Sequence, residues 1–120
     1  MGYRSEVAFV IEFNTPEQAQ AYFQQGLKKY SELAEACTYG LSFEDDSKYI
    51  KFEVDWYKWY EDYPEVQQLT EFYRKSIDAE GFLGYAFCRI GEDINDVDED
   101  YEGDNAYEYL HVSRCLVVNV

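Results

Sequence analysis

Carboxylates gather in the acidic segment, residues 91–105, where eight Asp and Glu side chains stand without a basic residue among them. Five of the eight recur at every second position. In an extended chain these five would face one way, about 6.6 Å apart at a rise of about 3.3 Å per residue. Phosphates along a nucleic-acid strand are comparably spaced, so this row could enter another protein's nucleic-acid-binding groove and accept charge-assisted hydrogen bonds from its Arg and Lys side chains. The row consists of Asp96, Asp98, Asp100, Glu102 and Asp104.

Two other interpretations fit the acidic segment. It could be a solvated, mobile hairpin loop. It could also hold calcium, because Asp98, Asp100 and Glu102 have the spacing of the first three EF-hand ligands, and Gly103 follows where that loop needs glycine. The twelfth position is Tyr109, however, and a strand is expected there in place of a helix. Only weak binding of a divalent cation is therefore left open, and no cofactor is predicted.

Acidic residues outside this segment stand beside aromatic ones, chiefly around residues 55–63. Exposed Trp and Tyr side chains among acids make good anchors for a protein partner, because these aromatics dominate interface energetics. The alternative is that Tyr57 and Trp59 pack under a loop or against an uncovered face of the sheet. The residues predicted to bind a partner are Asp55, Tyr57, Trp59, Glu61, Asp62, Asp93, Asp96, Asp98, Glu99, Asp100, Glu102 and Asp104.

Catalytic chemistry has little support in the sequence. His111 is the only histidine, and neither Cys88 nor Cys115 stands in a pattern that would make a Cys–His pair catalytic. The chain contains no glycine-rich phosphate loop, GxSxG, CxxC or HExxH motif. We therefore expect a protein that is not an enzyme.

Composition predicts one folded domain, residues 1–120, because 47% of the residues are hydrophobic. Its net charge of −15 should repel nucleic acid and anionic membranes and attract basic protein surfaces. The three cysteines lack close spacing, which indicates reduced thiols and a cytoplasmic protein. No apolar run approaches the roughly 18 residues that a membrane-spanning helix needs.

The longest alternating run predicts a half-buried strand over residues 49–60. Val54 and Trp56 would end its core-facing side, and Tyr57 and Trp59 would point the other way. Thr15, followed by Pro16, predicts the start of a helix in which Gly26 packs closely on the sheet. The other expected strands span residues 6–13, 38–44, 82–90 and 107–118, and the expected helices span residues 16–36 and 64–80.

This order of elements fits a ferredoxin-like α+β fold. It has split β-α-β units, an extra C-terminal strand, and a mostly antiparallel sheet with two helices on one face. Such a scaffold would present the acidic segment between its last two strands.

The opening residues, Met1-Gly2-Tyr3-Arg4-Ser5-Glu6-Val7, resemble the start of small uncharacterised proteins of bacteriophages and prophages. The resemblance covers only these residues. Small acidic phage proteins include inhibitors of host defence, such as anti-CRISPR proteins and DNA mimics, and this chain is similar to that class in charge and size. No catalytic or binding residue carries over from the resemblance.

Together these features predict an acidic phage-type protein that acts in the cytoplasm of a host cell. It would bind and inhibit a basic host protein, one that itself binds nucleic acid, without contacting nucleic acid or membrane. The alternative is a ferredoxin-like structural or homo-oligomerising module whose acids serve only solubility.

Overall fold

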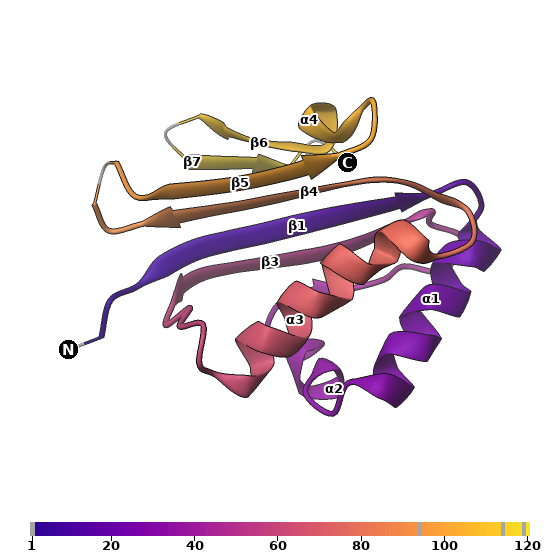
Figure 1. The fold of residues 1–120 in the computed structure, drawn as a ribbon, viewed down its shortest axis with the longest axis horizontal. Helices are drawn as coiled ribbons and strands as arrows, with labels where there is room; N and C mark the ends of the chain where they lie inside the picture. The colour runs from indigo at the N-terminus through magenta and orange to yellow at the C-terminus, as the bar shows by residue number, and fades with distance from the viewer. Residues whose placement is uncertain (1, 94, 114, 119) are drawn as a thin grey trace.

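The computed structural model describes residues 2–93, 95–113, 115–118 and 120 (Figure 1). It has an α+β fold with an open, antiparallel sheet of five strands and a separate pair of strands near the C-terminus. Along the chain come β1 (Ser5–Phe13), α1 (Pro16–Lys29), α2 (Leu33–Ala36), β2 (Leu41–Ser42), β3 (Tyr49–Tyr57), α3 (Pro64–Lys75), the 3-10 helix η1 (Ser76–Asp78), β4 (Phe82–Gly91), β5 (Val97–Glu102), α4 (Ala106–Tyr109), β6 (Leu110–Ser113) and β7 (Cys115–Val118).

The five-stranded sheet has the order β2-β3-β1-β4-β5, and every neighbouring pair is antiparallel. β1 lies in the middle and is apolar on both faces, as a strand covered on both sides must be. Val7, Phe9 and Ile11 face the helices, whereas Ala8 and Val10 face the opposite side.

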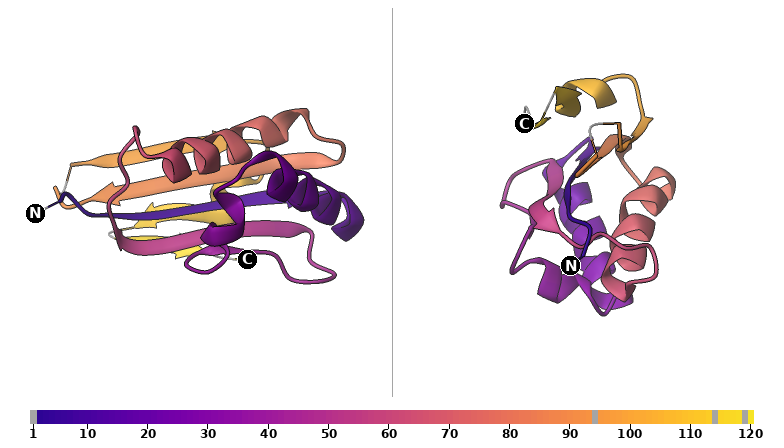
Figure 2. Two further views of the ribbon diagram at one scale, coloured as in Figure 1. Left: turned by 90° about the horizontal axis from the view of Figure 1, so that it is seen from below. Right: turned by 90° about the vertical axis from the view of Figure 1, so that its left-hand side faces the viewer.

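α1 and α3 pack on one face of the sheet over a core rich in aromatic rings (Figures 1 and 2). The Phe9 ring lies 5.3 Å from Phe52 and 5.4 Å from Tyr73, and Tyr73 stacks on Phe87 at 4.8 Å. Large rings placed on both the sheet and α3 fix how far the helix stands above the strands.

α1 begins as the sequence predicts, because the Thr15 hydroxyl oxygen accepts a hydrogen bond from the Gln18 amide at 3.2 Å. It ends earlier than predicted, at Lys29, where Tyr30 turns to an extended conformation and a separate short helix, α2, follows. Gly26 does mark a close approach, but its neighbour is α3. A Cβ there would lie 2.4 Å from Cε1 of Phe72, so glycine lets the two helices meet.

The opposite face of the sheet is covered by α4 and the β6–β7 hairpin (Figure 2). The prediction of one extra C-terminal strand in the sheet is therefore wrong. β5 occupies that edge, and the C-terminal residues lie across the apolar face that Ala8 and Val10 present. A sheet face of this kind has to be buried against another element, and Tyr109 and Leu110 do so here.

β3 departs from its predicted alternation at Trp56, whose φ of 57° lies in the left-handed region. The pairing with β1 slips there, since Ser5 faces Tyr57 whereas Val7 faces Val54. One extra residue in a strand exchanges its two faces. The prediction for this end of the strand is thus wrong: Trp56 is 65% exposed, and Tyr57 turns to the helix side.

The expected strand over residues 38–44 shrinks to two paired residues, Leu41 and Ser42. Among the residues that the structure describes, no helix combines the length and apolar character needed to cross a membrane.

A buried carboxylate joins the C-terminal segment to the sheet. Glu12, on β1, is 6% exposed; it accepts a hydrogen bond from the Tyr109 hydroxyl and lies 3.0 Å from the Lys48 ammonium nitrogen. Burial alone would raise the pKa of Glu12, but the hydrogen bonds from Tyr109 and Lys48 outweigh it and lower that pKa below the ordinary 4.5.

We expect this carboxylate to make the fold acid-sensitive. Because its pKa is lower in the folded chain, Glu12 stabilises the fold above pH 4.5, and this contribution is lost as pH falls through the folded-state pKa. The variant Glu12→Gln should therefore lie furthest below the wild type in unfolding free energy near pH 7 and approach it towards pH 3. Urea denaturation at a series of pH values measures the gap; a gap independent of pH would contradict the assignment.

Candidate functional site

The acidic segment forms the edge strand β5 through Val97–Glu102 and is not a loop there. β5 pairs with β4 so that Asp98 lies opposite Arg89 and Asp100 opposite Phe87. An extended backbone sends alternate side chains to one face, and Asp98 and Asp100 both reach the helix side of the sheet, where they line a groove. The predicted alternating row is thus realised over this stretch.

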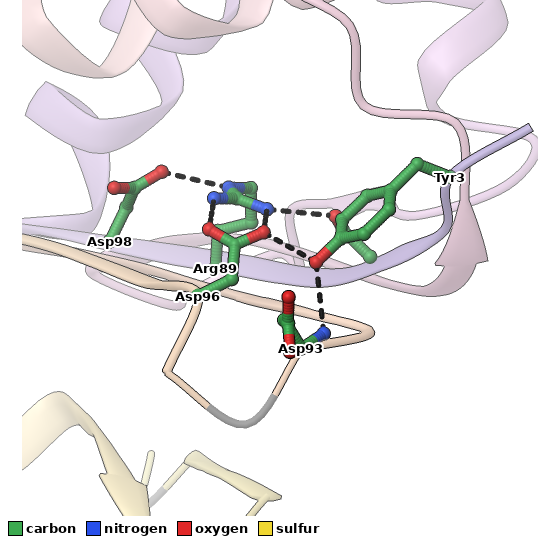
Figure 3. Close-up of polar contacts among 6 residues, drawn as sticks. Tyr3, Arg89, Asp93, Asp96 and Asp98 are labelled. Carbon is green, nitrogen blue, oxygen red and sulfur yellow. Dashed lines mark hydrogen bonds and ion pairs between the residues drawn. The ribbon is translucent and has the colours of Figure 1, made fainter.

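Arg89 holds the carboxylates of this row in place (Figure 3). Its Nη1 and Nη2 donate to the two oxygens of Asp96, and its Nε donates to Asp98 at 2.8 Å. Nη1 also donates to the Ser5 hydroxyl at 3.0 Å. The Arg89 side chain is only 13% exposed, and a planar guanidinium matches two carboxylates in this forked way.

Tyr3 fastens the N-terminal residues to the same cluster (Figure 3). Its hydroxyl donates to Asp96 at 2.6 Å and accepts from the Asp93 amide at 2.9 Å. The hydrogen bond from Arg89, followed by that from Tyr3, lowers the pKa of Asp96 below its usual range. Asp96 is therefore a carboxylate at neutral pH. Its hydrogen bonds connect the turn before β5 to Arg89 on β4 and to Tyr3 in the N-terminal residues.

The groove lies between α3 and the β4–β5 edge and has a volume of about 650 Å³. Aromatic side chains line its inner part: Trp59, Tyr73 and Phe87. Acidic side chains outnumber basic ones around it, with five of the former against two of the latter. The acidic residues are Glu61, Asp96, Asp98, Glu99 and Asp100, and the basic residues are Arg74 and Arg89.

Arg74 reaches over the groove from α3 and is held less firmly than Arg89. Its side chain is 63% exposed, with Nε 3.6 Å from Asp100 and the guanidinium carbon 5.9 Å from the centre of the Tyr73 ring. Asp100 also accepts hydrogen bonds from the hydroxyls of Tyr85 at 3.1 Å and Tyr73 at 3.4 Å. Burial raises the pKa of Tyr73 to about 12, so its hydroxyl remains a donor at neutral pH.

The structure brings half of the predicted binding residues to this groove: Trp59, Glu61, Asp96, Asp98, Glu99 and Asp100. The other half lies outside it. Asp93 is in the β4–β5 turn, Glu102 and Asp104 are exposed at and after the end of β5, Asp55 is exposed on β3, and Asp62 is exposed before α3. Tyr57 is half-buried, stacked on Tyr39 and bonded to Glu65.

Sequence reasoning missed several residues that also line the groove, among them Arg89, Arg74 and Tyr73. Arg89 carried a signal, because it is a single charge inside the otherwise apolar run from Tyr85 to Ile90. A charge in a buried strand needs a partner, and the acidic segment is the nearest source of one.

The EF-hand spacing does not produce a calcium loop. Asp98 and Asp100 lie in a strand and are paired with Arg89 and Arg74. Across residues 2–93, 95–113, 115–118 and 120, the structure places no group of three or more His, Cys, Asp or Glu side chains that could hold a metal ion.

Cys88 is buried on the sheet face that α4 and the β6–β7 hairpin cover, with its Sγ 3.4 Å from the Tyr101 hydroxyl. Burial raises the pKa of the Cys88 thiol to about 11, so it is protonated at neutral pH. His111 is on β6, which packs over the same face, and its ring stacks on that of Tyr107 at 5.0 Å. No contact between Cys88 and His111 is among those that the structure describes, and the side chain of the other cysteine considered, at position 115, lies outside the described side chains.

Chemically, the groove is an acceptor site for cations. Its carboxylates accept hydrogen bonds, and its aromatic rings offer faces on which a guanidinium or ammonium group can rest.

The chain was compared with protein-family models, curated proteins and solved structures, and none of them matches it.

Proposed function

We propose that this chain is a non-enzymatic, phage-type protein that binds and inhibits a basic host protein in the host cytoplasm. The partner binds nucleic acid, and the chain occupies its nucleic-acid-binding surface as an anti-defence protein or DNA mimic. The observation that carries the proposal is β5, which holds a row of carboxylates in extended form at the edge of a packed sheet. A net charge of −15 on 120 residues supports it.

We also propose that the scaffold is ferredoxin-like. The order β2-β3-β1-β4, with α1 after β1 and α3 after β3, is what two split β-α-β units would produce. β5 is then the added strand, in place of the C-terminal one. In this arrangement the helices cover the strands next to β1 and leave β5 accessible at the edge.

Capture from a nuclease-treated bacterial lysate tests the proposed function. The immobilised protein should retain DNA- or RNA-binding proteins, and retention should fall on the order of tenfold between about 0.1 M and about 0.5 M salt, since the attraction is between exposed charges. Added double-stranded DNA should compete with the immobilised protein. Mass spectrometry identifies what is retained.

A variant with Glu99→Gln, Glu102→Gln and Asp104→Asn tests whether the acidic edge of the sheet carries the binding. These three residues are exposed and make no ion pair that would hold the fold among the contacts that the structure describes. The variant should fold normally and retain less. Retention that ignores salt, DNA and these substitutions would refute a binding mode based on charge.

A further inference from the structure

The groove beside β5 already holds guanidinium groups, and they belong to this chain. Arg89 lies deep in it, and four hydrogen bonds, two to Asp96 and one each to Asp98 and Ser5, engage its guanidinium. This arrangement shows how the carboxylate row takes an arginine: two acids spaced along a strand face the edges of one planar fork.

Arg74 rests in the same groove in a weaker way. The ion pair that the described residues give it, to Asp100, is long at 3.6 Å, and most of its side chain is in water. Exposed ion pairs of this kind contribute little, because solvent screens them and two long side chains must be ordered. Arg74 can therefore be displaced from Asp100 without disturbing the fold.

Acceptors remain at the rim after these pairs are counted. The Asp98 side chain is 62% exposed although it pairs with Arg89, and Glu61, in the turn before α3, is an exposed residue that also lines the groove. Trp59 and Tyr73 lie beneath them. Aromatic faces below and carboxylates above suit a side chain that carries a cationic head on an apolar stem. An open acidic surface would attract any cation and would not favour such a side chain.

We propose that this groove receives an arginine-rich segment of the partner protein, and that Arg74 occupies the site until a partner guanidinium replaces it on Asp100 and Tyr73. The inference rests on the proposed function and adds where the partner binds and which of its side chains the groove prefers. A groove of about 650 Å³ has room for more than one side chain. Arginine is preferred over lysine because its planar fork matches paired carboxylates, whereas an ammonium group is a point charge.

The test uses fluorescein-labelled nona-arginine and nona-lysine peptides, with binding followed by fluorescence anisotropy at constant salt. Arg74→Gln is compared with Lys28→Gln, which removes the same charge from an exposed position on α1. Asp98→Asn is compared with Asp45→Asn, in the turn at the opposite edge of the sheet. Thermal melts establish that each variant is folded.

We expect Arg74→Gln to tighten nona-arginine binding about threefold or more, and Lys28→Gln to change it much less. Asp98→Asn should weaken binding about three- to tenfold, and Asp45→Asn should have little effect. Nona-arginine should bind more tightly than nona-lysine.

Equal effects within each pair of variants, or equal affinity for the two peptides, would overturn the groove as the site. The proposed function would then still be judged by lysate capture, since a diffuse acidic surface can bind a basic partner. Absence of any peptide binding would overturn the groove as well, again without deciding the capture experiment.

Discussion

Replacing Tyr109 with alanine should lower the free energy of unfolding by about 3–5 kcal/mol, as for other large buried aromatic side chains. Tyr109 is buried between the sheet and the C-terminal hairpin, with its ring 6.0 Å from that of Tyr49. The substitution leaves a cavity beside Ala8 and removes a donor from the buried Glu12 carboxylate. Urea denaturation measures the loss, and hydrogen exchange at Leu110 and Val112 reports whether the hairpin is released.

Tyr107→Ala provides the matched control, because Tyr107 is on the same short helix but exposed. Its cost should stay within about 1 kcal/mol. Tyr109→Phe separates packing from hydrogen bonding and should cost about 1–3 kcal/mol, since it removes only the donor to Glu12. A similar loss for Tyr107→Ala and Tyr109→Ala would mean that the hairpin does not depend on this anchor.

The second large effect is expected at Arg89. Arg89→Met should cost about 2–3 kcal/mol near pH 7, because it leaves the carboxylates of Asp96 and Asp98 side by side without their cation. The value lies below that for a fully buried pair because both acids reach water. Urea denaturation again gives the number.

The cost of Arg89→Met should diminish in acid. The guanidinium lowers the pKa of Asp96, so its contribution is present above the ordinary pKa of an aspartate and lost as pH falls through the lowered value. Arg74→Met is the comparison and should cost about 0–1 kcal/mol, as an exposed pair. Equal costs for the two arginines would contradict the difference in how they are held.

Local patterns predicted the elements whose contacts follow from their own sequence. The alternation through Val7 and Phe9 predicted β1, and Thr15 with Pro16 predicted where α1 begins. The wrong predictions concern segments whose conformation depends on residues far away in the sequence. The shift at Trp56 depends on how β3 pairs with Ser5, and the C-terminal residues fold back because Ala8 and Val10 offer an apolar face.

The site was predictable only on one side. The spacing of Asp96, Asp98 and Asp100 predicted a row of carboxylates, and all three line the groove. Its cations, Arg74 and Arg89, come from α3 and β4, so their approach to the row depends on the packing of Tyr73 against Phe87. No spacing within the acidic segment could have indicated a groove beside it.

The two borders of the sheet have a consequence for how the chain meets other proteins. β2 offers only two residues to a foreign strand, and four of the six residues of β5 are acidic. A bare sheet border invites main-chain pairing and fibre growth, whereas charge and shortness discourage both. We therefore expect both borders to resist main-chain pairing with another chain, so that concentrated solutions of the protein should not form fibrils.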